Sequence, residues 1–158
     1  MMCRSFEQIM KDYHENSRLS KYSAEKLPDE IKCHIQCLLG NEFWSDCIFE
    51  NDNGEYLYAE RDDADDFVLI AVSGNGDEWL LRLSDGIVHF LDHDIWEEPN
   101  GIFSIGISFE QFVVIADLLR QFEESNPYPS SKESVEQLKG QLRIIEGNLV
   151  DNFPYAIV

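Results

Sequence analysis

Four polar residues that lie close together in the chain have side chains that could bind a metal: His89, Asp92, His93 and Asp94. Imidazole nitrogens and carboxylate oxygens are ligands that zinc and iron accept. If a strand continues through this segment, His89 and His93 share one face, because strand side chains alternate. The spacing matches no helical HExxH motif, and no separate base or nucleophile is nearby. We therefore expect ordinary polar residues at a strand end, with no metal, no cofactor and no catalytic residue.

The cysteines form a second candidate set. Cys33 and Cys37 lie four residues apart on a predicted helix, with His34 between them, and Cys3 and Cys47 stand alone. A structural zinc site needs a second pair at ligand spacing, which the chain lacks. We interpret the cysteines as buried, reduced thiols. No serine lies in a nucleophile elbow and no glycine-rich loop has phosphate-binding spacing, so we expect a protein that is not an enzyme.

The charge of the chain restricts its partners. Its 158 residues include 31 Asp and Glu against 12 Lys and Arg, a net charge of −19. Nucleic-acid backbones and anionic membranes repel such a surface, whereas a basic protein is its natural complement. Solubility alone remains the alternative explanation. The N-terminus lacks an apolar signal segment and no apolar run approaches ~18 residues, so we expect a cytoplasmic protein.

Three apolar runs, 67–72, 78–83 and 87–92, predict the centre of the fold. The glycines and asparagine of the 73–77 turn favour a tight reversal, and Asp85-Gly86 is a strong hairpin signal. Such short connections join antiparallel neighbours, so we predict a meander. Segments 47–50 and 55–60 are predicted as two further strands of the same sheet, and 95–106 as irregular.

Helices are predicted before and after these strands in the sequence. They span residues 6–15, the segment from Pro28 to about Leu39, and residues 108–124. Ser108 and Gln111 form a capping box for the 108–124 helix, and Ile107 can pack against Phe112 as a hydrophobic staple. Phe109, Phe112 and Ala116 are expected to pack on the sheet. The fold class is therefore α+β, a twisted, mainly antiparallel sheet with helices packed against it.

The C-terminal segment has a different pattern. Ser130 and Glu133 suggest another capping box, and the apolar residues that follow form a narrow seam at spacings of three and four: Val135, Leu138, Leu142, Ile145 and Leu149. We expect residues 127–158 to be a helical extension docked on the domain formed by 1–126, in a monomer. A dimer contact through this seam is the alternative.

The central stretch resembles the signature region of the SUKH superfamily, the Smi/Knr-like proteins, over about residues 22–124. The matching residues are Gly76, Asp77, Asp85, Gly86, Phe90, Asp92, His93 and Asp94. The resemblance implies an α+β domain without catalytic residues. Many bacterial members are immunity proteins that bind and neutralise toxins, often nucleases, of contact-dependent or related systems, and others are scaffolds in cell-wall signalling.

Acidic residues are concentrated between Asn41 and Glu78, where twelve carboxylates accompany one base, Arg61. We predict a partner-binding surface here, formed by Glu55, Glu60, Asp62, Asp63, Asp65, Asp66, Asp77 and Glu78. The first functional hypothesis is an immunity protein that binds a cognate, basic toxin. The alternatives are an adaptor with a cellular partner and a metal-dependent enzyme that uses His89 and His93.

Overall fold

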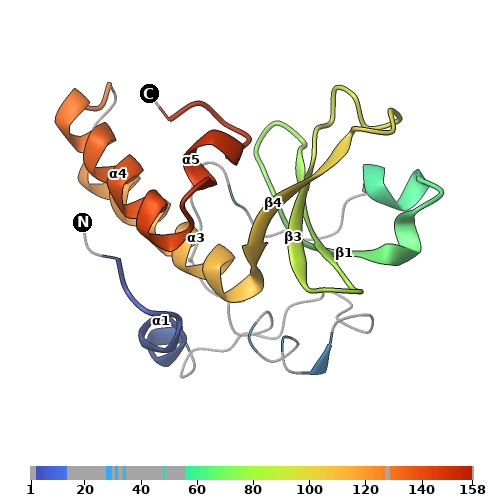
Figure 1. The fold of residues 1–158 in the computed structure, drawn as a ribbon, viewed down its shortest axis with the longest axis horizontal. Coiled ribbons are helices and arrows are strands. Elements are labelled where there is room, and N and C mark those ends of the chain that lie inside the picture. Colours follow the sequence, from blue (N-terminus) through green and yellow to red (C-terminus); the bar gives the residue numbers. More distant parts are fainter. Residues whose placement is uncertain are drawn as a thin grey trace.

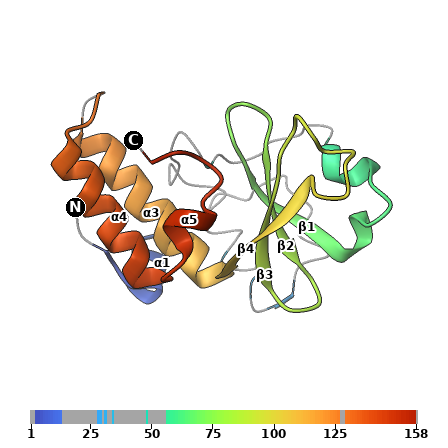
Figure 2. The same ribbon diagram turned by 45° about the horizontal axis from the view of Figure 1, so that its top comes forward.

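An antiparallel sheet with the strand order β1-β2-β3-β4 lies beside a layer of helices (Figures 1 and 2). The computed structural model describes residues 3–13, 28, 29, 31, 34, 48, 56–126 and 129–157. The strands are β1 (Phe67–Val72), β2 (Glu78–Arg82), β3 (Ile87–Leu91) and β4 (Ile102–Ser108). The α+β class predicted from the sequence is therefore confirmed.

The first three strands form the predicted meander. Phe67 pairs with Arg82 across β1 and β2, and Glu78 pairs with Leu91 across β2 and β3. The turn between β1 and β2 contains Gly76 at φ 97°, a backbone conformation that other L residues rarely adopt. Each strand begins and ends within one residue of its predicted boundaries.

The fourth strand corrects the prediction of irregular structure over 95–106. Ile105 and Ile107 are both buried and lie two residues apart, which is the period of a strand with one face in the core. Between them Gly106 has φ 77°, and the pairing of β3 with β4 shifts register between Ile87 and His89. The glycine therefore marks a bulge inside the strand.

Helices cover one face of the sheet (Figures 1 and 2): α1 (Phe6–Tyr13), α3 (Phe109–Ser125), α4 (Lys132–Ile145) and α5 (Leu149–Asn152). The predicted capping box at the start of α3 is present. Ser108 Oγ accepts from the Gln111 backbone nitrogen at 3.2 Å, and Gln111 Oε1 accepts from the Ser108 backbone nitrogen at 2.9 Å. The Phe112 ring packs against Trp79 of β2 at 5.4 Å between centroids.

The C-terminal helices pack on the rest of the described molecule. Leu138, Leu142 and Leu149 are buried in the same hydrophobic core as β1–β4 and α3, with Ile145 packed against it. The expected capping residue is shifted by one position: Ser131, not Ser130, accepts from the backbone nitrogen of Ser134. Among the described helices, none combines the length and apolar character needed to span a membrane.

The other face of the sheet has a smaller apolar cluster, formed by Phe67, Leu69, Leu80 and Leu91. Two 3-10 helices, η2 (Leu57–Glu60) and η3 (Ala64–Asp66), precede β1 on this side. The prediction of a strand over 55–60 is therefore wrong for its described part. Several predictions lie largely or wholly outside the described residues. They are the strand 47–50, the helix that begins near Pro28, and the interpretation of Cys33, Cys37 and Cys47.

Candidate functional site

The acidic turn before β1, residues 57–66 with η2 and η3, is held on the sheet by a buried carboxylate. Glu78, 3% exposed, accepts hydrogen bonds from the backbone nitrogens of Leu57 at 2.6 Å and Tyr58 at 3.1 Å. These two bonds satisfy amide groups at the start of η2, which turns the chain away from strand geometry. Burial raises the pKa of the Glu78 carboxyl above its ordinary value, although the two amides oppose this change.

Arg61 joins the acidic turn to the loop between β3 and β4. Its Nε and Nη2 donate to the two carboxylate oxygens of Asp63 at 2.8 and 3.1 Å. Its Nη1 donates to the carbonyl oxygen of Glu98 at 3.0 Å and to that of Trp96. Paired guanidinium bonds of this kind fix geometry as well as charge. The pKa of Asp63 is consequently held below its ordinary value, chiefly by the bond from Arg61.

The loop between β3 and β4, which Arg61 contacts, is itself closely packed. The Gly101 backbone nitrogen donates to the Glu98 carbonyl oxygen at 3.0 Å, and the Gly101 carbonyl accepts from Asp92 at 3.0 Å. A Cβ at position 101 would collide with the carbonyl oxygen of Ile95, so glycine is required by close backbone approach. The loop therefore presents its side chains in a defined position.

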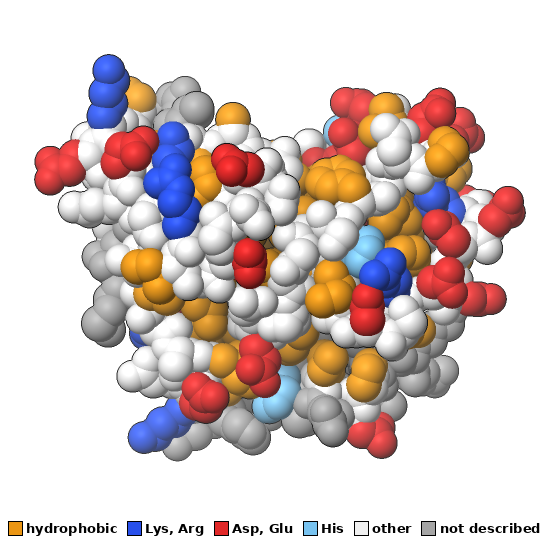
Figure 3. Space-filling view, in the orientation of Figure 1, with side chains coloured by type: hydrophobic (Ala, Val, Ile, Leu, Met, Phe, Trp, Pro, Cys, Tyr) orange, Lys and Arg blue, Asp and Glu red, His pale blue; other side chains and the backbone are white. Residues whose placement is uncertain are grey.

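An open groove of about 460 Å³ lies between the turn and the loop, and we call it the acidic groove. It is lined by Glu60, Arg61, Asp62, Asp63, Trp96, Glu97 and Pro99. Arg61 is the one basic residue in this lining, and its guanidinium is already bound to Asp63 and to backbone carbonyls. Figure 3 shows acidic side chains gathered at this end of the molecule, away from α4.

Several of the predicted partner-binding residues lie at or next to this groove. Glu60, Asp62, Asp65 and Asp66 are exposed, and the Asp63 side chain is 40% exposed while it pairs with Arg61. Glu55 lies outside the described residues. The structure thus brings five of the eight predicted carboxylates together on η2, η3 and the turn between them.

Asp77 and Glu78 do not belong to that exposed surface. They are 4% and 3% exposed, and each carboxylate accepts hydrogen bonds from inside the protein. Their charge alone had led us to predict both residues as part of the partner-binding surface. Burial corrects that grouping: Glu78 holds η2 in place, and Asp77 holds a histidine.

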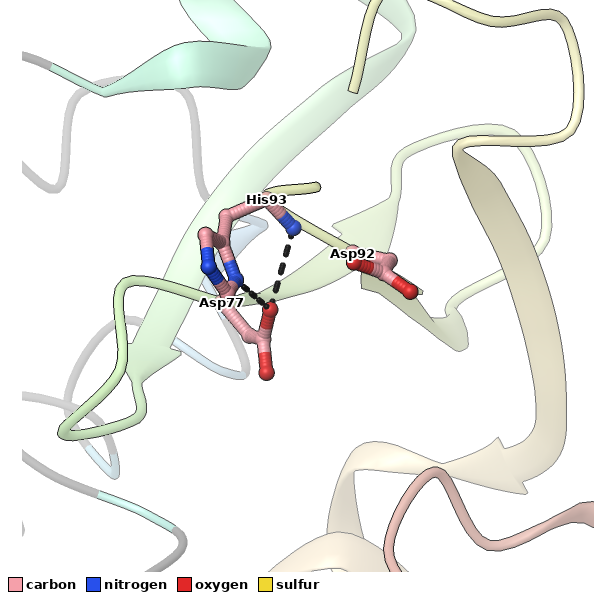
Figure 4. A group of neighbouring side chains, drawn as sticks. All are labelled: Asp77, Asp92 and His93. Atoms are coloured by element: carbon pink, nitrogen blue, oxygen red, sulfur yellow. Dashed lines mark hydrogen bonds and ion pairs between the residues drawn. The ribbon is translucent and has the colours of Figure 1, made fainter. Parts of the chain in front are cut away.

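Asp77, Asp92 and His93 form a separate cluster at the end of β2 and β3 (Figure 4). Asp77 Oδ1 accepts from His93 Nδ1 at 2.7 Å and from the His93 backbone nitrogen at 3.0 Å, and Asp77 Oδ2 accepts from Tyr155 Oη at 2.7 Å. The pKa of His93 is raised, mainly by its bond to Asp77. Burial would raise the pKa of Asp77, but these bonds hold it below its ordinary value.

His89 is not part of this cluster. Its ring is 5% exposed and packs edge-on against Phe67 at 5.3 Å, and its Nδ1 lies 3.0 Å from the carbonyl oxygen of Ile87. Burial lowers the pKa of His89. Because β3 ends at Leu91, the alternation expected to align His89 with His93 does not extend that far.

Sequence reasoning missed the second wall of the acidic groove. Trp96, Glu97 and Pro99 belong to a segment that the sequence analysis treated only as irregular. The signal was the run Trp-Glu-Glu-Pro, which places two further carboxylates beside an aromatic residue. Its position opposite the turn depends on the long-range bond from Arg61, which no local pattern indicates.

No protein-family model, curated protein or solved structure was found to match the chain. None of these comparisons therefore supplies a function for the chain.

Proposed function

We propose that this chain is a cytoplasmic immunity protein that binds and neutralises a basic toxin, without catalysis, through its acidic face. The acidic face consists of exposed carboxylates that line the acidic groove, Glu60, Asp62 and Glu97, and of those that follow them closely in the chain, Asp65, Asp66 and Glu98. One observation supports the proposal most. Carboxylates from two distant segments surround a hollow whose one basic lining residue, Arg61, is already engaged within the protein.

Electrostatics explains what such a face does. Like charges held close together repel one another, and the cost is relieved when a cationic partner covers them. Exposed charges act over a screening length of about 8 Å at physiological salt, so a fixed cluster attracts a basic protein before contact. The expected gain is faster association and discrimination against acidic partners.

The toxin as partner follows from the resemblance to the SUKH superfamily together with the charge of the chain. Nuclease toxins need basic surfaces to bind phosphates, and a rigid acidic face can cover such a surface. The same charge argues against nucleic acid as the ligand. The C-terminal seam is buried within the chain's own core, which favours action as a monomer.

The proposal is tested by co-expression with the protein encoded next to this chain's gene. The expected result is that the neighbouring protein arrests growth, that this chain restores it, and that the two proteins co-purify. The test variant replaces Glu60, Asp62, Asp66 and Glu97 by their amides, which removes four charges while leaving Asp63 and its bond to Arg61 intact.

A matched control removes four charges from the helical half of the molecule. Glu110→Gln, Glu133→Gln, Glu136→Gln and Asp151→Asn are all exposed positions on α3, α4 and α5. Protection should weaken in the acidic-face variant and persist in this control. Equal protection by both variants would place the binding surface elsewhere, and no protection by the unmodified chain would refute the function.

A further inference from the structure

Sheet register brings three potential metal ligands together. Glu78 pairs with Leu91 at the end of the β2–β3 ladder, so Asp77 and Asp92 lie just beyond that pair on opposite strands. His93 follows Asp92, and its ring turns toward Asp77 (Figure 4). From the sequence we expected no metal at the set of His89, Asp92, His93 and Asp94. In the structure, Asp77 takes the place of His89 beside Asp92 and His93.

The distances suit a single small cation. Each of the three residues offers one ligand atom, and these atoms all lie within 4.8 Å of one another. Two atoms bound at ~2.0–2.2 Å to one ion lie about 3.3–4.4 Å apart, so the cluster must adjust by a few tenths of an ångström to admit it. The separation of 2.7 Å between His93 Nδ1 and Asp77 Oδ1 is a hydrogen bond that must lengthen when the ion binds.

Every one of these side chains also has a partner that orients it. Tyr155 Oη donates to Asp77 Oδ2 at 2.7 Å and leaves Oδ1 directed at the histidine. His93 Nε2 lies 3.2 Å from Asp94 Oδ1, and the Asp94 backbone nitrogen donates to Asp92 Oδ1 at 2.9 Å. Metal-binding histidines usually pair their second nitrogen with a carboxylate in this way.

We propose that Asp77, Asp92 and His93 bind one first-row divalent cation, with zinc as the expected ion. A set of one imidazole and two carboxylates accepts several such ions, and zinc binds more tightly than manganese or iron by the general order of affinities. The ion takes the place of the proton on His93 Nδ1, which is released to solvent, while Nε2 keeps its proton toward Asp94. Water fills the remaining coordination positions.

The ion would join three parts of the chain. Asp77 belongs to the β1–β2 turn, Asp92 and His93 to the β3–β4 loop, and Tyr155 brings in the C-terminal segment through Asp77. Asp92 and His93 are partly exposed, so the ion can enter from solvent. Because the ion binds the folded chain, zinc should raise thermal stability by mass action. This inference is independent of the proposed toxin.

The test is a zinc titration of the intact chain against a chromophoric chelator, with thermal unfolding measured with and without zinc. We expect one zinc per chain and a zinc-dependent rise in the unfolding temperature. His93→Gln and Asp92→Asn should each weaken binding at least about 100-fold and abolish that rise, and Asp94→Asn should weaken binding about 10–100-fold. Asp92 is partly exposed, so its variant remains informative if His93→Gln folds poorly.

His34→Gln is the matched control, because His34 follows Cys33 directly and lies three residues before Cys37, so it would belong to any thiol site there. Zinc binding should be unchanged in this variant. The proposal is overturned if the intact chain binds no zinc, if His93→Gln and Asp92→Asn bind zinc as tightly as the intact chain, or if binding is lost in His34→Gln.

Discussion

Arg61 Nη1 donates to the Glu98 carbonyl oxygen at 3.0 Å, across 37 positions of the chain. The same guanidinium binds both carboxylate oxygens of Asp63. One side chain therefore fixes the spacing between the two walls of the acidic groove. The groove is a built feature of the fold rather than a chance meeting of two surface loops.

Replacement of Arg61 should loosen that spacing. Arg61→Met keeps much of the apolar stem but removes every donor, so it leaves Asp63 unpaired and two carbonyl groups without this partner. We expect a loss of about 1–3 kcal/mol in the free energy of unfolding, measured by urea denaturation. Arg143→Met, at an exposed position on α4, is the control and should change stability by less than about 0.5 kcal/mol. Similar small losses in both variants would show that Arg61 does not hold the groove.

Phe112 tests the packing of α3 on the sheet. Its ring is 5% exposed and contacts Trp79, itself 1% exposed. Phe112→Ala should therefore lower the free energy of unfolding by about 3–5 kcal/mol in denaturant melts. Phe103→Ala, on a ring that is 36% exposed at the sheet edge, should cost clearly less. A loss below about 1 kcal/mol for Phe112→Ala would remove the ring from the core.

Leu142 tests whether the C-terminal seam is intramolecular. It is 0% exposed and lies in the main core, whereas Ile144, two residues on, is 77% exposed. Leu142→Ala should cost about 2–5 kcal/mol without altering a monomeric mass in light scattering, and Ile144→Ala should change little. If the intact chain is a dimer and Leu142→Ala converts it to a stable monomer, the seam is an interface instead.

Asp117 predicts a pH dependence of stability. Burial would raise its pKa, but hydrogen bonds from Arg4 and Arg120 hold the pKa of Asp117 below 3.8. The unfolded chain therefore binds this proton more readily than the folded chain. The stabilisation that ionised Asp117 contributes is complete at pH values above 3.8. It is lost as the pH falls through the lower pKa that Asp117 has in the folded chain.

Asp117→Asn should accordingly destabilise the protein most at neutral pH. We expect the difference in unfolding free energy from the intact chain to narrow below about pH 4. Urea denaturation at about pH 7 and about pH 3 measures it, and because both proteins share every other titrating group, the difference isolates Asp117. A difference independent of pH would contradict the ionised pairing with Arg4 and Arg120.

Local signals predicted much of the fold. The meander follows from turn chemistry at 73–77 and Asp85-Gly86, and α3 from the capping box of Ser108 and Gln111. β4 was missed because the turn residues Pro99, Asn100 and Gly101 led to a prediction of irregular structure over all of 95–106. In the structure, Gly101 permits close backbone approach and Gly106 forms a bulge. The two-residue spacing of Ile105 and Ile107 was the available signal.

The candidate sites were harder to predict because they depend on long-range contacts. The local pattern of segment 55–60 predicts a strand. The structure differs because the Glu78 carboxylate accepts hydrogen bonds from the backbone nitrogens of Leu57 and Tyr58. Asp77 resembles the surface acids near it in the sequence. Only the structure shows that Tyr155 and His93 donate hydrogen bonds to its carboxylate. Neither carboxylate differs locally from its exposed neighbours, so charge alone could not separate them.

Association kinetics test most directly whether the acidic face binds a basic partner. Stopped-flow mixing of this chain with the proposed toxin, the protein encoded by the neighbouring gene, compares the intact chain with the acidic-face variant and the helical control at low and at physiological salt. We predict that loss of Glu60, Asp62, Asp66 and Glu97 charges slows association about tenfold at low salt and flattens its salt dependence. Association unchanged at both salt concentrations, or slowed equally by the control, would contradict the account.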